Sequence, residues 1–158
     1  MENKLAENIY WVGVHFPQPE PGGSVNAFLI KDEKITVIDT GAPATAQWVA
    51  NNIKALVEPK EIDYIVLTHA DVDHAGGLTT LLAEAPQATV IASEMEARSI
   101  PMWGAQANIK IVKDGENLSL GQHALRFIAM PFTCTPGSMA VFEEKEGILF
   151  SADLFACL

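Results

Sequence analysis

The densest cluster of potential metal ligands in the sequence is Thr68-His69-Ala70-Asp71-Val72-Asp73-His74-Ala75-Gly76-Gly77. Within it, two imidazoles and two carboxylates fall in six consecutive positions. Imidazole and carboxylate together suit zinc, iron or manganese, whereas an all-oxygen set would suit calcium or magnesium. The run therefore predicts a transition-metal site built from His69, Asp71, Asp73 and His74.

We expect residues 69–74 to form an extended loop between a strand and a helix, because β-rich residues precede them and Gly76 and Gly77 allow an abrupt turn. On an extended backbone, side chains 69, 71 and 73 project to one side, and a tight turn then brings His74 inward. One loop would in this way serve two adjacent metal positions. A polar loop in which Asp73 merely caps the next helix would leave both histidines unexplained. The spacing also lacks the acidic and glycine positions of an EF-hand.

Helical and strand patterns alternate on either side of this loop. Apolar spacing predicts helices over 46–56 and 78–85, which end before Pro59 and Pro86. Ser93, with Glu96 three residues later, resembles a capping box. The Pro/Gly cluster at 17–23 reads as a loop within the domain. Strands are expected at 9–14, 25–30, 34–39, 62–67, 88–92, 109–112, 125–128, 140–142 and 148–150. This order predicts an α/β layered sandwich, with helices packed outside a sheet.

Length and composition exclude several classes of protein. A chain of 158 residues suits one domain, and its 49% hydrophobic fraction excludes disorder as the main state. With 20 acidic and 10 basic residues, it lacks the basic face that nucleic acid requires. Two cysteines, Cys134 and Cys157, are too few for a disulfide framework. The start of the sequence has no apolar signal region, and no run is long enough to span a membrane, so we expect a cytoplasmic protein with no membrane partner.

Residues 68–77 resemble the signature loop of the metallo-β-lactamase superfamily, commonly His-x-His-x-Asp-His, and Ile38-Asp39-Thr40-Gly41 matches its supporting Asp-Thr-Gly turn. Within the superfamily, the chain is similar to the di-iron domain of flavodiiron proteins and to related oxygen-binding di-iron proteins. This likeness runs through residues 8–13, 62–66, 112–116, 118–121 and 148–153. The resemblance implies one domain over 1–158 with the αββα four-layer fold, here mainly the N-terminal half plus the start of the second sheet.

The resemblance also implies a set of metal ligands. His69, Asp71 and the residue at 134 would hold one ion, Asp73 and His74 would hold a second, and Asp153 would bridge both. A carboxylate suits the bridging place because it has two oxygens. Asp39 would orient the ligand loop without touching metal. The implied metal is a pair of iron ions, with zinc as the alternative.

Three positions depart from the family's pattern. Asp71 stands where flavodiiron proteins usually have glutamate and other members have histidine. Cys134 stands where the family has histidine; it is either a thiolate ligand or a small buried hydrophobe. The family's last histidine ligand lies beyond Asp153, and this sequence ends at Leu158. We therefore expect a domain that is incomplete at its C-terminus, with an uncovered sheet face beside Phe150 and Leu154 that makes it a homo-oligomer or part of a longer chain.

Three functions remain open at this stage. The first is a non-haem di-iron protein that binds, senses or reduces O2 or NO, fed by an electron-donor protein because no FMN domain is present in this sequence. The second is a metal-dependent hydrolase of thioesters, lactones or lactams, which Thr135-Pro136-Gly137-Ser138 favours because superfamily hydrolases often carry it after a histidine ligand. The third is a catalytically impaired scaffold. The long flavodiiron-like stretches place the di-iron function first.

The remaining histidines and a Met-Trp pair are assigned no role in the site. His15 is expected in a solvated loop, and His123 at a surface hairpin turn. Met102 and Trp103 are expected to pack in the core rather than line a pocket.

Overall fold

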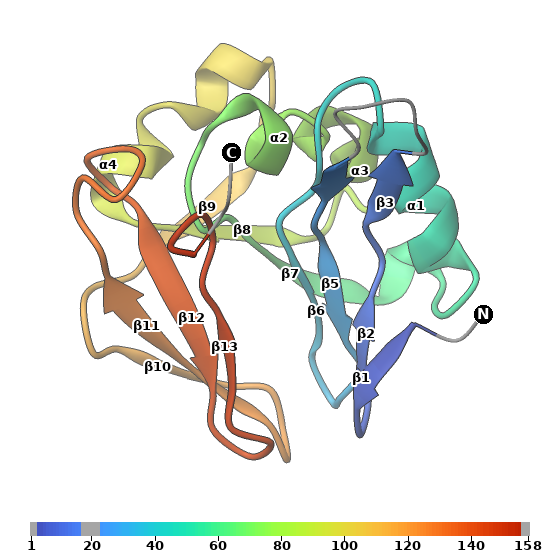
Figure 1. Ribbon diagram of the computed structural model, residues 1–158. Coiled ribbons are helices and arrows are strands. Elements are labelled where there is room, and N and C mark those ends of the chain that lie inside the picture. The colour runs from blue at the N-terminus through green and yellow to red at the C-terminus, as the bar shows by residue number, and fades with distance from the viewer. Residues whose placement is uncertain (1–2, 17–22, 156–158) are drawn as a thin grey trace.

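Two β-sheets face each other and enclose one of two hydrophobic cores (Figure 1). The structure is a computed structural model, and it describes residues 3–16 and 23–155. The loop expected at 17–23 lies outside the described residues except for Gly23, and so does Cys157.

The larger sheet joins the N-terminal meander to the parallel strands that follow, in the order β1-β2-β5-β6-β7-β8-β9. Pairing is antiparallel up to β6 and parallel from β6 to β9, where helical segments lie between successive strands. Its strands are β1 (Lys4–Ala6), β2 (Ile9–Trp11), β5 (Phe28–Ile30), β6 (Ile35–Ile38), β7 (Ile62–Val66), β8 (Thr89–Ala92) and β9 (Asn108–Ile111). A separate two-stranded sheet pairs β3 (Val14–Phe16) with β4 (Gly23–Val25).

Two amphipathic helices, α1 (Ala46–Lys54) and α3 (Leu78–Glu84), cover the outer face of this sheet (Figure 1). The buried residues of α1 are Ala46, Val49, Ala50 and Ile53, the face that the periodicity predicts. The other helical segments are α2 (Val72–Ala75), α4 (Glu94–Ala97) and the 3-10 turns η1 (Pro59–Glu61) and η2 (Ile100–Trp103). Within the described residues, no helix combines the length and the apolar character that a bilayer span requires.

The smaller sheet has the order β10-β11-β12-β13 and is antiparallel throughout. Its strands are β10 (Asn117–Ser119), β11 (Ala124–Ala129), β12 (Met139–Glu143) and β13 (Ile148–Phe150). Side chains of its inner face, such as Phe127 and Val141, pack against Ile9, Ile38 and Ile91 of the larger sheet. Helices, the larger sheet and the smaller sheet are thus stacked in layers, which confirms the predicted α/β sandwich.

Several expectations for individual segments were wrong. Residues 9–14 and 25–30 are not continuous strands, because each run is interrupted before the chain continues in another sheet. Strand β10 was not anticipated as an element. The sheet face beside Phe150 is covered, since that ring is 3% exposed and lies against Phe28, with ring centroids 4.8 Å apart. Each sheet supplies the apolar cover for the other.

The parallel strands determine where polar residues gather. Because β6, β7 and β8 run in the same direction, their C-terminal ends meet at one edge of the sheet. Asp39 follows β6, Thr68 and His69 follow β7, and Ser93 follows β8 at this edge. Figure 1 shows α2 at this end of the molecule, with β13 running towards it from the opposite sheet.

A side chain at Gly77, at the start of α3, is expected to destabilise the fold. A Cβ atom at this position would lie 2.1 Å from the backbone oxygen of Thr40, so alanine would have to push apart the turn and the helix. We expect Gly77→Ala to lower the free energy of unfolding by about 1–3 kcal/mol, measured by urea denaturation. Gly23→Ala is the matched control, because nothing lies within 4 Å of its Cβ position. Equal urea midpoints for the two variants would contradict the expectation.

Candidate metal centre

The ligand run is only partly extended, which corrects the expectation from sequence. Residues 72–75 form one helical turn, α2, so Asp73 and His74 project from a helix while His69 precedes it on the loop. Asp71, and not Asp73, occupies the N-cap position, with no side-chain cap hydrogen bond. The helical turn gives Asp73 and His74 different directions from those they would have on a strand, and the ring centroids of His69 and His74 lie 4.0 Å apart.

Asp39 holds the second half of the run in place. Its carboxylate accepts hydrogen bonds from the backbone nitrogen and the hydroxyl of Thr68, each at 2.8 Å, and from Nδ1 of His74 at 2.8 Å. Because a carboxylate only accepts, Nδ1 of His74 carries the proton and Nε2 is turned towards the space between the sheets. Asp39 has a φ of 57°, a left-handed conformation that aspartate tolerates better than most residues. It orients the imidazole, as the resemblance implies.

His69 presents a buried nitrogen that has no hydrogen-bond partner among the described residues. Its side chain is 0% exposed, and Nε2 lies 3.3 Å from Oδ2 of Asp153. Its Nδ1 lies 3.3 Å from the hydroxyl of Thr68. A buried polar atom without a partner carries a free-energy cost of roughly 1–3 kcal/mol, which a bound ion would remove.

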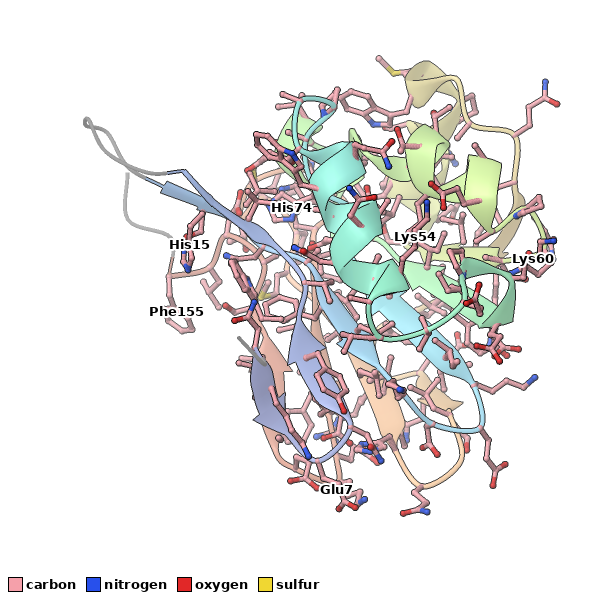
Figure 2. All side chains as sticks on the ribbon, turned by 90° about the vertical axis from the view of Figure 1, so that its right-hand side faces the viewer. Glu7, His15, Lys54, Lys60, His74 and Phe155 are labelled. Atoms are coloured by element: carbon pink, nitrogen blue, oxygen red, sulfur yellow. The ribbon has the colours of Figure 1, made fainter. Side chains whose placement is uncertain are left out.

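Asp153 lies between the two imidazoles and reaches each with a different oxygen. Its Oδ1 is 3.0 Å from Nε2 of His74, and its Oδ2 is 3.3 Å from Nε2 of His69. The preceding Ala152 has a φ of 49°, which is unfavourable for alanine and turns the chain sharply after β13. A carboxylate placed in this way could bridge two ions. Figure 2 shows His74 in the upper part of the view, away from Glu7 at the bottom.

Cys134 reaches the same place from the loop between β11 and β12. It is exposed, so the alternative of a small buried hydrophobe is wrong. Its Sγ donates a hydrogen bond to Oδ2 of Asp71 at 3.0 Å. The thiol therefore faces the ligand run, although it is separated from it by more than sixty residues of sequence.

The candidate ligands form two overlapping groups. In one, His69, Cys134 and Asp153 place one donor atom each within 4.8 Å of one another; in the other, Asp73, His74 and Asp153 do the same. Asp71, with its side chain 46% exposed, lies beside the first group, 3.9 Å from Nε2 of His69. Imidazole, carboxylate and thiol donors, arranged around an unpartnered buried nitrogen, fit a pair of transition-metal ions.

The electrostatics of the site favour a positive ion. Burial opposes the charged form of His74, but the hydrogen bond to Asp39 and the negative charges of Asp39, Asp73 and Asp153 outweigh it and raise its pKa to about 9. The hydrogen bond to Asp71, partial burial and Asp153 raise the pKa of the Cys134 thiol to about 12. The aspartates contribute to both shifts, because their negative potential holds protons and equally attracts a metal cation.

A cavity of about 470 Å³ opens beside the second group. Asp39, Thr68, Asp73, His74 and Asp153 contribute its polar wall. Its apolar wall is formed by residues of both sheets and of the segment after β13, namely Phe28, Leu149, Phe150 and Phe155. The space is large enough for a diatomic molecule or a small organic substrate to reach the carboxylates.

Glu96 is a site residue that the sequence reasoning missed. Ser93 caps α4 by accepting the backbone N–H of Glu96 at 3.3 Å, but the Glu96 carboxylate does not return to Ser93. It is buried and accepts from Ala70 N at 2.8 Å, Thr135 Oγ1 at 2.7 Å and Gly137 N at 3.0 Å. Glu96 thus ties the loop that carries His69 to the loop that carries Cys134. Its capping-box spacing pointed to a local role and concealed this one.

We expect Glu96→Gln to weaken both the fold and metal binding. The amide NH2 would face one of three donors, leaving a buried donor unpaired at a cost of about 1–3 kcal/mol. Because the two loops would lose their shared anchor, we expect zinc affinity to fall by about 10- to 100-fold in a chelator competition. Glu94→Gln is the control, since Glu94 is exposed and forms a surface ion pair with Arg98. Unchanged affinity and unfolding free energy in Glu96→Gln would contradict this assignment.

The expectations for the other histidines and for the Met-Trp pair were met only in part. His123 is 1% exposed and lies 3.0 Å from Oε1 of Glu143, so the surface assignment was wrong. His15 is exposed, as expected, but lies in β3 and contacts Ser24 Oγ at 2.6 Å. Trp103 packs against the core and donates to Ala70 O at 3.1 Å, whereas Met102 is 84% exposed. None of these four residues is a member of the two donor groups.

Two curated relatives match nearly the whole chain. It is 33% identical over 168 residues to the anaerobic nitric oxide reductase flavorubredoxin of Salmonella arizonae, an alignment that covers 96% of this chain and 34% of that protein. It is 34% identical over 167 residues to the flavo-diiron protein FprA2 of Clostridium acetobutylicum, covering 98% of this chain and 42% of the relative. The chain thus spans about a third to two fifths of the length of these relatives.

Solved structures agree with this likeness. The flavodiiron protein from Giardia intestinalis superposes with a TM-score of 0.87 at 27% identity, covering 96% of this chain and 39% of that one. The rubredoxin oxygen:oxidoreductase from Desulfovibrio gigas gives 0.86 at 28% identity, covering 94% and 40%. The family described as ODP family beta lactamase matches residues 24–158. With this match and the metallo-β-lactamase fold of its neighbours, the chain belongs to the ODP beta-lactamase family.

Proposed function

We propose that this chain is the metal-binding part of a flavodiiron-type protein, which binds a pair of iron ions and, with them, binds or reduces O2 or NO. The position of Asp153 carries the proposal, because its two oxygens lie 3.0 and 3.3 Å from Nε2 of two separate histidines. The names of the relatives support the choice of reaction, since they include a nitric oxide reductase and an oxygen oxidoreductase.

Each part of the site has a task in this proposal. His69, Asp71 and Asp153 bind the first ion, while Asp73, His74 and Asp153 bind the second. Asp39 keeps the His74 ring oriented and its Nδ1 protonated. The ions, when bound, supply electrons to the diatomic substrate, and a donor protein must replace those electrons.

The apolar part of the adjoining cavity wall, formed by Phe28, Phe150 and the exposed Phe155, can accept a small, weakly polar substrate beside the carboxylates. By contrast, the hydroxyls that suggested a hydrolase serve the loop itself. Thr135 Oγ1 donates to Glu96, and Ser138 Oγ accepts from Thr135 N. The geometry therefore gives the hydrolase no separate support.

The test is anaerobic iron loading followed by exposure to O2 or NO. We expect close to two iron ions per chain, one for each donor group, and an absorption change on adding either gas. Asp153→Asn should lose at least one ion and the absorption change. Asp63→Asn is the control, because Asp63 forms a surface ion pair with Lys34 instead. Zinc-only binding without a gas-dependent spectrum, together with cleavage of a thioester or lactone, would replace this proposal with the hydrolase.

A further inference from the structure

The first donor group differs from the second in one chemical respect, which is sulfur. Its donors are an imidazole nitrogen of His69, the Sγ of Cys134 and a carboxylate oxygen of Asp153. The second group has one imidazole and two carboxylates. Thiolate is a soft ligand that zinc, cobalt and iron accept and that magnesium, calcium and manganese do not favour. The two positions are therefore not equivalent.

We propose that Cys134 binds metal as a thiolate and makes the two positions unequal, so that the first selects a thiophilic ion such as iron(II), zinc or cobalt and fills before the second. The inference rests on the two-ion centre proposed above. It departs from the flavodiiron pattern, in which histidine stands at this position. This chain would then hold an N, S, O position beside an N, O position, joined by Asp153.

An independent observation supports a ligand at the first position. His69 Nε2 is fully buried, has no hydrogen-bond partner among the described residues, and lies 3.3 Å from Asp153 Oδ2. His69 belongs to the same donor group as Cys134. A cysteine near two acids would be unremarkable alone, but a buried unpaired imidazole nitrogen in the same group indicates that a cation completes the position.

The binding step requires no oxidant or reductant. As a divalent ion enters, the Sγ–H bond of Cys134 breaks, its electron pair stays on sulfur, and the proton leaves to solvent. Oδ2 of Asp71, which accepts the thiol hydrogen at 3.0 Å, loses that hydrogen bond and becomes free to bind the same ion. The short aspartate at 71 and the thiol at 134 therefore act as a pair across the two loops.

Hydrogen bonds that do not involve the thiol hold the Cys134 loop in place. The Cys134 loop is held to α4 by Thr135 Oγ1 and Gly137 N, which both donate to Glu96. It is also joined to the ligand run by Met139 N, which donates to Thr68 O at 2.9 Å. These bonds set the position of Cys134 relative to His69 without involving the thiol. A substitution at 134 should therefore leave the loop in place.

The test uses cobalt(II) alone, added under reducing, oxygen-free conditions to the chain carrying Cys157→Ser, so that Cys134 is the sole thiol. We expect a thiolate-to-cobalt charge-transfer band in the near ultraviolet that grows with the first equivalent and is complete before the second. In parallel, cobalt or zinc should slow alkylation of the exposed Cys134 by iodoacetamide by about tenfold or more. Neither measurement requires a variant at position 134.

Two variants at position 134 test whether the charge-transfer band arises from the Cys134 thiolate. Cys134→Ser should lose the charge-transfer band and bind zinc at least about 10- to 100-fold more weakly. Cys134→His should bind cobalt without the band, because imidazole replaces sulfur. Far-ultraviolet circular dichroism of both metal-free variants checks that they are folded; the measurements on Cys157→Ser stand even if one is not.

The results separate this inference from the proposed function. Cobalt binding without a charge-transfer band, a band that persists in Cys134→Ser, or alkylation unaffected by metal would overturn the role of Cys134 while leaving a metal centre. A band that grows only with the second equivalent would overturn the order of filling. Failure of cobalt, zinc and iron to bind at all would overturn both proposals.

Discussion

Replacing His69 with alanine is expected to remove most of the bound metal while leaving the fold intact. The first position would lose the one imidazole that the described part of the chain gives it, and removal of a metal-site residue of this kind costs at least about 10- to 100-fold in affinity. The fold should survive because Nε2 makes no hydrogen bond within the described residues and Nδ1 has only a 3.3 Å contact with Thr68. Metal content per chain after gel filtration measures the first effect, and circular dichroism of the metal-free protein measures the second.

His15→Ala is the control for this experiment. His15 is exposed, contacts Ser24 and Trp11, and is absent from both donor groups. Its replacement should leave the metal content unchanged. A His69→Ala protein with its full metal content would show that the ligand assignment is wrong, whatever the control does.

The largest expected loss of stability comes from a site far from the metal ligands. His123 and Glu143 are both buried, with their side chains 0% exposed and Nδ1 3.0 Å from Oε1. The Glu143 carboxylate also accepts the backbone N–H groups of Lys145 and Glu146 at 2.8 Å each. We expect Glu143→Ala to lower the free energy of unfolding by about 3–5 kcal/mol, because one buried partner and two turn donors lose their acceptor. Urea denaturation measures this directly.

The neighbouring Glu144→Ala is the matched control, with an expected effect within about 0.5 kcal/mol because Glu144 is partly exposed and makes only a 3.8 Å contact with Arg126. Lys145 pairs with Glu7, which Figure 2 places at the end of the molecule opposite His74. Metal content per folded chain should therefore be unchanged in Glu143→Ala. A loss below 1 kcal/mol, on the order of a single neutral hydrogen bond, would show that the buried pair contributes little.

This buried pair also explains why His123 was wrongly expected at the surface. The residues Gly121-Gln122-His123 have the composition of a surface turn. Gly121 and Gln122 are indeed exposed, but His123 is buried: Asp32 accepts its backbone N–H at 2.6 Å, and Glu143 approaches the ring. The partners lie 91 and 20 residues away in sequence, so no local pattern could reveal them.

Local periodicity predicted most of the regular elements. The apolar spacing of α1 and α3 and the compact strand β7 were placed correctly, because one buried face imposes its period on the sequence. Strand breaks were not predicted: residues 9–14 and 25–30 were each expected as one strand, yet each divides between two sheets, at Val12-Gly13 and at Asn26-Ala27. β propensity is satisfied equally in either sheet, so the division depends on which neighbours are available for pairing.

By itself, the sequence determined the kind of chemistry, through two imidazoles and two carboxylates in six positions, and the family, through residues 68–77 and 38–41. Only the tertiary structure decided how the donors divide. It placed Asp153 between two histidines, turned Cys134 towards Asp71, and used Glu96 to hold two loops together. The reason is physical: donor type is a property of each side chain, whereas a binding site requires donor atoms a few ångströms apart. In this chain that proximity arises from parallel strand ends and a facing sheet, which bring together residues far apart in sequence.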